Sequence, residues 1–197
     1  MSNLPRPIPG ILATSALILI IAILSAGCTG PASSPPGSPS NVSVPASGDN
    51  PSWKIFPLTD LKEKGNFSIT SFSGKPVLVP ILSEDCPTCI VLLNRQLAEI
   101  DRLPGVREGK ITVVSLDLDP AGGPGYIVAH HDQYNFTGYS ARSPEDLTLN
   151  LLHTFGPFAI DTSAAPVILV CPDGHDLLLP NGVKTAEVLG ATLEEEC

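Results

Sequence analysis

Basic residues are scarce in this sequence. Of its 197 residues, 11 are Lys or Arg and 20 are Asp or Glu, so the net charge is −9. Binding to nucleic acid needs clustered Lys and Arg side chains that contact the phosphates, and this balance therefore argues against a nucleic-acid partner. The length, once the ends are set aside, suits one domain with a real apolar core.

Complete sets of metal ligands are missing as well. The chain has one CxxC motif, Cys86 to Cys89, and no second one that would complete the four ligands of a zinc site. No histidine stands at metal-ligand spacing from another, and we expect surface or helix-capping roles for all four: His130, His131, His153 and His175. A zinc site therefore does not fit the CxxC motif, and a redox pair or a structural disulfide fits it better.

The CxxC motif stands between a predicted strand and a predicted helix. An apolar run at 77–82 predicts a buried strand, and Cys86-Pro87-Thr88-Cys89 follows it. Apolar side chains then recur at helical spacing, on the face that also carries Cys89. This context favours a redox dithiol. We expect Cys86, at the helix N-terminus, to attack a substrate disulfide, and Cys89, buried one turn further in, to resolve the mixed disulfide.

Two carboxylates precede the predicted dithiol. Glu84 and Asp85 come directly before Cys86, and negative charge near a thiol raises its pKa. We therefore expect Cys86 to be less acidic than a cysteine at a bare helix N-terminus, which favours a reductant. Glu84 is the best nearby candidate for a proton acceptor. Asp117 and Asp119 follow the next predicted strand, where we expect them to be solvated, although such a pair can also bind a cation.

The first 28 residues have the pattern of an export signal. Arg6 gives a weakly positive start, and the apolar run at 11–24 is shorter than the ~20 residues of a membrane span. The segment ending in Ala-Gly-Cys28 resembles a lipobox, in which Cys28 becomes the lipidated first residue. An uncleaved anchor helix is the alternative. Both place the rest of the chain outside the cytoplasm, tethered to the outer face of the cytoplasmic membrane.

Residues 29–52 are rich in Pro, Ser and Gly and cannot bury a core, so we expect a disordered, semi-extended linker before a domain at 53–197. Two further cysteines lie in that domain. Cys171 and Cys197 can pair in an oxidising compartment and fasten the C-terminal helix to a strand end. Alternatively, Cys171 is a half-buried strand residue and Cys197 a free thiol.

Strands alternate with helices along the domain, which predicts an α/β sandwich with a mixed sheet flanked by helices. Pro80 conflicts with its place in a strand, because proline has no N–H for the sheet; a β-bulge or a shorter strand would resolve the conflict. We expect strands at 53–58, 66–72, 77–82, 111–116, 136–139, 167–170 and 176–179, and helices after the CxxC motif and at 126–134, 144–154 and 184–195.

Three stretches carry a resemblance to a known family: Phe72-Ser-Gly-Lys-Pro-Val-Leu-Val before the CxxC motif, the motif itself, and Ala165-Pro166 directly before a strand. Over residues 57–195 the chain resembles the thioredoxin-like superfamily, especially membrane-tethered thiol–disulfide oxidoreductases of the TlpA/ResA type. The resemblance implies a thioredoxin-like three-layer sandwich. It also implies a cis Pro166 beside the dithiol, with Ala165, Pro87 and Thr88 in contact with the substrate. Typical TlpA members have Trp where this chain has Asp85.

The middle of the chain also resembles the SCO-type copper proteins and the peroxiredoxins, which share the fold. SCO proteins have two cysteines three residues apart and a histidine before the late strand, whereas this chain has CxxC and no histidine at 161–163. The peroxiredoxin pattern before a single cysteine is absent too. A copper site of Cys86, Cys89 and His153 is left as an alternative.

The expected function is therefore that of a membrane-anchored, extracytoplasmic thiol–disulfide oxidoreductase. Its Cys86–Cys89 disulfide would serve exported protein thiols and disulfides and a membrane electron donor, with no further cofactor. The alternatives are an SCO-like copper chaperone for metal-centre assembly and a non-catalytic thioredoxin-fold lipoprotein whose CxxC is a static disulfide.

Overall fold

The computed structural model describes residues 52–62, 64–119, 127–129, 132 and 136–197. The chain divides into two units, and every described residue belongs to the second, Pro45–Cys197. The predicted export signal with Cys28, and the predicted linker up to residue 51, lie outside the described residues. Within the described ranges no helix has both the length and the apolar character needed to cross a membrane.

A five-stranded mixed sheet forms the centre of this domain, with the strand order β5-β4-β3-β6-β7. β3, β4 and β5 run parallel, whereas β6 is antiparallel to both of its neighbours, β3 and β7. The strands are β3 (Val77–Leu82), β4 (Thr112–Asp117), β5 (Tyr139–Arg142), β6 (Val167–Val170) and β7 (Asp176–Leu178). The predicted mixed sheet is confirmed, and the three parallel strands end on the same side of the sheet.

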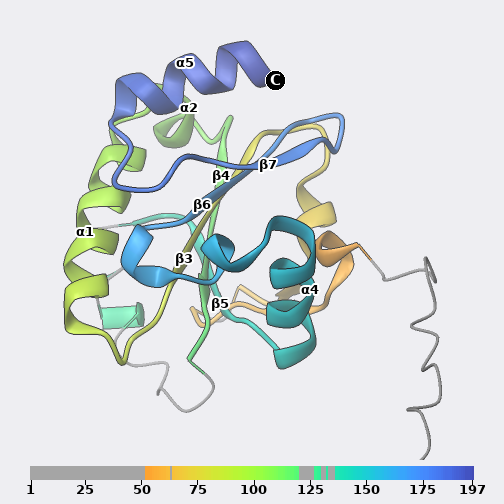
Figure 1. The fold of residues 1–197 in the computed structure, drawn as a ribbon. Coiled ribbons are helices and arrows are strands. Elements are labelled where there is room, and N and C mark those ends of the chain that lie inside the picture. The colour runs from red at the N-terminus through yellow and green to blue at the C-terminus, as the bar shows by residue number, and fades with distance from the viewer. Residues whose placement is uncertain (1–51, 63, 120–126, 130–131, 133–135) are drawn as a thin grey trace, which may run out of the picture. The chain divides into compact units, whose positions relative to one another are not determined.

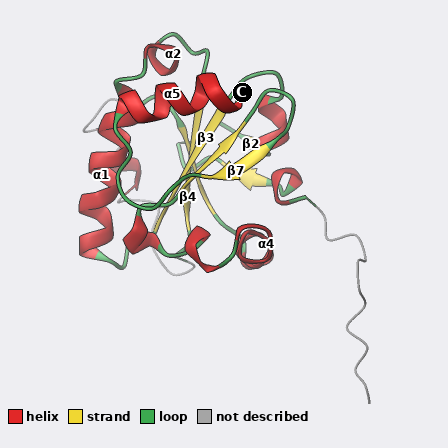
Figure 2. Ribbon diagram, turned by 45° about the horizontal axis from the view of Figure 1, so that its top comes forward, coloured by secondary structure: helices red, strands yellow, loops and turns green. Residues whose placement is uncertain are grey.

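Helices cover both faces of the sheet. Figure 1 shows α1 and α5 on one side of it and α4 on the other, and Figure 2 shows α2 beside α5. Separate apolar cores fill the two interfaces. The helices are α1 (Pro87–Asp101), α2 (Pro104–Arg107), α4 (Glu145–Phe155) and α5 (Ala186–Glu196). This is the predicted three-layer α/β arrangement.

β3 supplies side chains to both cores, because all six of its residues are buried. Val77, Val79 and Ile81 pack in the core with α4, and Leu78 and Leu82 pack in the core with α1. Burying one such aliphatic side chain stabilises the fold by ~1.5–3 kcal/mol. A strand buried on both faces has a continuous apolar run rather than an alternating one, which explains the sequence at 77–82.

Pro80 neither bulges β3 nor shortens it, so both predicted solutions are wrong. The pairs on either side of it, Leu78↔Val113 and Ile81↔Leu116, keep the same offset between β3 and β4. The N–H of Ile81 donates to Pro166 on the β6 side at 3.0 Å, so the missing N–H of Pro80 faces β4. The parallel ladder accommodates the proline by omitting the pairs opposite residues 79 and 80.

The N-terminal elements differ from the prediction. Instead of strands at 53–58 and 66–72, the structure has 3-10 turns at Trp53–Ile55 and Ile69–Phe72, and a two-stranded ribbon of Leu58–Thr59 with Asn66–Phe67. Ser52 and Ser68 begin the two turns. Serine competes for nearby backbone groups and favours such turns over extended strands. The predicted strand at 136–139 is also displaced, since β5 begins at Tyr139.

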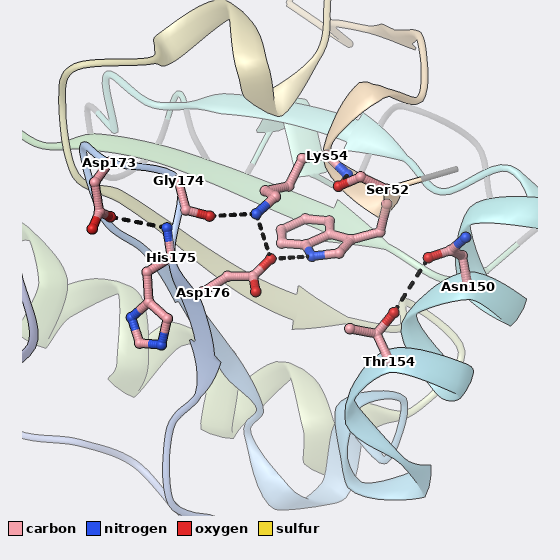
Figure 3. A network of polar contacts seen from close by, with 9 residues as sticks. Ser52, Lys54, Asn150, Thr154, Asp173, Gly174, His175 and Asp176 are labelled. Atoms are coloured by element: carbon pink, nitrogen blue, oxygen red, sulfur yellow. Dashed lines mark hydrogen bonds and ion pairs between the residues drawn. The ribbon is translucent and has the colours of Figure 1, made fainter. Parts of the chain in front are cut away.

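Trp53 fastens the start of the described chain to the C-terminal hairpin. Its buried indole N–H donates to Asp176 Oδ2 at 2.6 Å, and its ring meets that of Phe155 edge-on with centroids 5.9 Å apart. Lys54 pairs with the same carboxylate at 2.9 Å (Figure 3). The chain therefore enters the described domain beside β7.

α5 is held at both ends. A disulfide joins Cys171, directly after β6, to Cys197, with the Cα atoms 5.2 Å apart. At the other end Glu99 Oε2, from α1, accepts the Ala186 N–H at 2.9 Å, and Leu189 is buried in the core between them. The last helix is thereby fixed both to β6 and to the helix that carries the CxxC motif.

Candidate redox site

Cys86 and Cys89 form a disulfide across the first turn of α1, with the Cα atoms 5.1 Å apart. Cys86 is the N-cap residue, its Sγ accepts the Cys89 N–H at 3.2 Å, and Pro87 follows in the first turn. Proline suits this position because its fixed φ is helical and an N–H there has no intrahelical partner. Cys86 is half-buried and Cys89 is 3% exposed. One sulfur is therefore accessible at a helix N-terminus, with an enclosed sulfur behind it.

Pro87 and Thr88 are exposed beside the accessible sulfur. The free N–H groups and the macrodipole at a helix N-terminus favour negative charge, so they stabilise a thiolate at Cys86. The contact of Pro87 and Thr88 with a substrate stays a prediction.

Pro166 and Ala165 line the same small pocket as Cys89. The described backbone contains no cis peptide bond, so the cis Pro166 implied by the family resemblance is wrong for this structure. Ala165 adopts the left-handed conformation at φ 48°, which no other described non-glycine residue does. This conformation turns the chain into β6 through a trans bond, and the Pro166 carbonyl then accepts the Ile81 N–H at 3.0 Å.

Both backbone groups of Ala165 are used inside the molecule. Its N–H donates to the Thr162 carbonyl at 3.3 Å, and its carbonyl oxygen accepts from Lys184 Nζ. The residue is 5% exposed. A substrate chain that bonded to Ala165 would have to use the second lone pair of that oxygen, and its predicted role in substrate binding stays a prediction.

Lys184 is a buried ammonium behind this turn, 5% exposed. The Gln96 side chain holds its backbone from both sides: Oε1 accepts the Lys184 N–H at 2.8 Å, and Nε2 donates to the Lys184 carbonyl at 3.1 Å. Burial lowers the pKa of Lys184 to about 8, because desolvation disfavours the charged form. α1 is thereby linked through Gln96 and Lys184 to the Ala165 turn.

Thr162 contacts the enclosed sulfur. It lies in the 3-10 turn Thr162–Ala164, and its Oγ1 donates to Cys89 Sγ at 3.3 Å. Among the described residues, those that line the pocket below this sulfur are Pro80, Ile81, Cys89, Leu93, Gln96, Thr162, Ala165 and Pro166, and none of them is a carboxylate. Thr162 is thus the hydroxyl nearest to the reacting atoms in this pocket.

Asp117 and Asp119 lie at the ends of the parallel strands, beside Arg142 of β5. Asp117 Oδ2 lies 3.7 Å from Arg142 Nη2 of β5, and Asp117 Oδ1 accepts the Asp119 N–H at 3.0 Å. Asp117 is 0% exposed and Asp119 4% exposed, so the expectation that they are solvated is wrong. Neighbouring parallel strands end here together, which lets Arg142 compensate part of the buried negative charge.

Glu84 belongs to this group of charges. Its Oε1 accepts the Ile127 N–H at 3.1 Å, and it does not line the pocket below Cys89. Burial raises the pKa of Glu84, and the charge of Asp117 adds to the increase. Burial likewise raises the pKa of Asp117. A direct role of Glu84 as proton acceptor for the dithiol stays a prediction.

His153 lies exposed in the last turn of α4. In the part of the chain that the structure describes, no three His, Cys, Asp or Glu residues gather where they could hold a metal ion. His153 is thus not grouped with Cys86 and Cys89 among the described residues, and a copper site there stays a prediction. His130 and His131 lie outside the described residues.

Three residues of the site were not predicted from the sequence: Thr162, Gln96 and Lys184. The sequence contains a signal for Gln96, because this polar residue lies on the apolar face of the predicted helix, one residue before Leu97. A polar side chain on a buried face needs a hydrogen-bond partner. Thr162 is 73 residues away from Cys89, and Lys184 is 88 residues away from Gln96. No local pattern connects residues so far apart.

Scans of the sequence against protein-family models and against curated proteins find no match. Solved structures do match. A secreted disulfide oxidoreductase of Mycobacterium tuberculosis, described as homologous to E. coli DsbE, has a TM-score of 0.53 at 14% identity, over 73% of this chain and 97% of that chain. A thioredoxin-family thiol:disulfide interchange protein of Chlorobium tepidum has a TM-score of 0.56 at 11% identity, over 71% and 91%.

A third match is the thioredoxin domain of a thiol–disulfide oxidoreductase from Bacteroides vulgatus, with a TM-score of 0.50 at 18% identity, over 72% of this chain and 91% of that chain. At such low sequence identities, these structural matches establish a shared fold only. The activity has to be inferred from the residues of the site. The strand order of the sheet and the helix that begins at the CxxC motif agree with the resemblance found in the sequence. The chain has the thioredoxin-like fold of these thiol–disulfide oxidoreductases.

Proposed function

We propose that this protein is a thiol–disulfide oxidoreductase that reduces or exchanges protein disulfides through Cys86 and Cys89. One observation carries the proposal: the half-buried Cys86 caps the N-terminus of α1, and its disulfide partner Cys89 is enclosed one turn further in. This asymmetry gives the two sulfurs different tasks. A disulfide with a purely structural role requires neither an accessible sulfur nor a cysteine at a helix N-terminus.

The first step is an attack by the Cys86 thiolate on a substrate disulfide. A bond forms between Cys86 Sγ and one substrate sulfur, and the other substrate sulfur leaves as a thiolate. The free N–H groups at the start of α1 stabilise the attacking thiolate. Exposed Pro87 and Thr88 border the approach to this sulfur.

In the second step the mixed disulfide is resolved. The Cys89 thiolate attacks Cys86 Sγ, the Cys86–Cys89 disulfide forms, and the second substrate thiolate leaves. Two electrons pass from the dithiol to the substrate, and the two thiol protons are lost to solvent. The N–H of Cys89 already donates to Cys86 Sγ at 3.2 Å, so the first turn of α1 holds the two residues at bonding distance.

An extracytoplasmic, membrane-anchored location is part of the proposal, with exported proteins as substrates and a membrane electron donor. The apolar run at 11–24 and the lipobox-like segment ending at Cys28 support it. The Cys171–Cys197 disulfide also supports it, because structural disulfides persist in oxidising compartments. Loss of membrane association in Cys28→Ala, measured by fractionation, would support lipidation, and unchanged association would favour the uncleaved anchor helix.

The activity is tested on the full-length protein in mild detergent, with a disulfide-linked fluorogenic peptide pair as substrate and a thiol reductant in excess. We expect turnover in the wild type and none in Cys86→Ser. Reduced Cys89→Ser, separated from the reductant before the peptide is added, should accumulate a mixed disulfide with the peptide, visible by mass spectrometry, because the attacking sulfur remains and the resolving sulfur does not. Turnover that survives Cys86→Ser would contradict the proposal.

The same preparations separate the alternatives. Tight Cu(I) binding that needs both cysteines, without peptide turnover, would favour a copper chaperone. A Cys86–Cys89 disulfide that neither turns over nor binds copper would favour a structural lipoprotein. Cys197→Ser serves as the control, since it removes a disulfide distant in sequence from the dithiol and should leave turnover within about twofold.

A further inference from the structure

The enclosed sulfur of the dithiol has few polar neighbours. Among the described residues that line the pocket below Cys89, only Gln96 and Thr162 have polar side chains. The Gln96 amide is bonded to the Lys184 backbone at 2.8 and 3.1 Å. The Thr162 hydroxyl, in contrast, donates directly to Cys89 Sγ at 3.3 Å.

β3 offers nothing polar to the same sulfur. Pro80 lines the pocket, and its side chain is on the face of β3 that also carries Leu78 and Leu82, toward α1. A proline ring has neither a proton nor a charge to give. An apolar enclosure disfavours a thiolate, yet the resolving step requires the thiolate of Cys89.

We propose that Thr162 is a catalytic residue whose hydroxyl stabilises the Cys89 thiolate and directs it at Cys86 during the resolving step. This inference rests on the proposed dithiol activity. The contact is a hydrogen bond to a sulfur that becomes anionic, and hydrogen bonds to charged groups are about twice as strong as those between neutral groups. The hydroxyl keeps its own proton throughout.

The position of Thr162 is fixed by its surroundings. Asp161 begins the 3-10 turn and accepts the Ser163 N–H at 3.1 Å. The Thr162 carbonyl accepts the Ala165 N–H at 3.3 Å, and Lys184 holds Ala165 from the other side. The hydroxyl is therefore presented to the sulfur by a bonded turn rather than by a free loop.

The two steps can be followed separately with dithiobisnitrobenzoate, a disulfide that releases a coloured thiolate. The full-length protein, with the Cys86–Cys89 dithiol reduced and the Cys171–Cys197 disulfide intact, releases one thionitrobenzoate when Cys86 attacks the reagent. It releases a second when Cys89 attacks the resulting mixed disulfide at Cys86, so the reagent gains two electrons and the dithiol becomes a disulfide. Stopped-flow absorbance across a range of pH gives a rate and a midpoint for each phase.

Thr162→Val removes the hydroxyl with little change of shape, and Thr162→Ser retains it. In Thr162→Val we expect the second phase to slow about tenfold near neutral pH, and its midpoint to rise by about one pH unit, since one pH unit in a thiol midpoint is a tenfold change in thiolate. The first phase should stay within about twofold. Thr162→Ser should keep both phases near those of the wild type.

The outcomes distinguish the two proposals. A wild-type protein that releases no second thionitrobenzoate would overturn the dithiol activity itself. A normal wild type with an unchanged second phase in Thr162→Val would overturn the role of Thr162 alone. Equal slowing in Thr162→Val and Thr162→Ser, with no shift of midpoint, would also overturn it, because packing rather than the hydroxyl would then control the rate.

Discussion

Lys184 donates a hydrogen bond from its buried ammonium to the carbonyl oxygen of Ala165. Ala165 is in the left-handed conformation, which is unfavourable for a residue with a Cβ and needs support from its surroundings. The same lysine is held through its backbone by Gln96 of α1. The turn that leads into β6 is thus tied to the helix that carries the dithiol.

The first prediction concerns the pH dependence of stability. Burial lowers the pKa of Lys184 from 10.5 to about 8 in the folded protein, so between these values the unfolded chain binds more protons and stability rises with pH. In oxidised protein, the unfolding free energy of the wild type relative to Lys184→Met should therefore rise between about pH 8 and pH 10.5 and be level well below pH 8. Urea unfolding across this range measures it.

Lys75→Met is the matched control, since it removes one charge from an exposed lysine. The same rise in both comparisons would mean that net charge, and not burial of Lys184, produces the effect.

A second prediction concerns the carboxylate two residues before the attacking cysteine. Glu84→Gln removes a half-buried carboxylate two residues before Cys86. Since nearby negative charge raises a thiol pKa, the pKa of Cys86 should fall, by about one unit or less, in this variant. The pH dependence of iodoacetamide alkylation of reduced protein measures it.

Asp85→Asn is the comparison, because Asp85 is exposed and water screens exposed charges; its effect should be smaller. An unchanged or higher pKa of Cys86 in Glu84→Gln would refute the effect. A wild-type Cys86 pKa below about 5, which is typical of strongly oxidising thiols, would refute the expectation of a reductant.

The third prediction concerns the second disulfide. Cys171→Ala combined with Cys197→Ser removes a link across 26 residues, and the chain-entropy account of disulfides gives a loss of about 3.5 kcal/mol in unfolding free energy. Guanidinium unfolding of oxidised protein measures the loss. Peptide turnover should stay within about twofold, because neither cysteine lines the pocket of the dithiol. A double variant as stable as the wild type would show that α5 is held by packing alone.

The fourth prediction uses Trp53, the one tryptophan of the sequence, as a reporter. Asp176→Asn keeps the shape of the carboxylate that accepts the indole N–H but removes its charge. Hydrogen bonds to charged groups contribute ~1.5–3 kcal/mol, so we expect about 1–2 kcal/mol less stability, with a red shift of tryptophan emission. Asp173→Asn, an exposed carboxylate in the same hairpin turn, is the control and should change neither quantity; an equal response would contradict the role of Asp176.

Apolar runs and helical spacing predicted correctly those strands and helices that depend mainly on residues close together in the sequence. The predicted strands at 77–82 and 167–170 have the bounds that the structure gives them, and the predicted helix at 144–154 differs from α4 by one residue at each end. Continuous apolar runs identify strands that are buried on both faces. The apolar stripe through Cys89, Leu93, Leu97 and Ile100 is buried as its spacing requires.

The predictions failed where distant segments decide the outcome. Asp117 was expected to be solvated and is fully buried, because β5 brings Arg142 beside it. A bulge or an early strand end was expected at Pro80. Instead, the parallel ladder between β3 and β4 omits two residue pairs, and β3 continues past the proline. The N-terminal strands gave way to 3-10 turns where serine side chains bond to nearby backbone groups.

The sequence by itself determined the dithiol: the CxxC spacing, the strand before it and the helix after it place Cys86 at a helix N-terminus and Cys89 on a buried face. Only the tertiary structure decided what surrounds those sulfurs. Thr162 reaches Cys89, and Lys184 holds Ala165, because β6 and α5 fold back against α1. Secondary structure follows from interactions between residues a few positions apart, whereas the environment of a buried sulfur depends on contacts that only the packed chain creates.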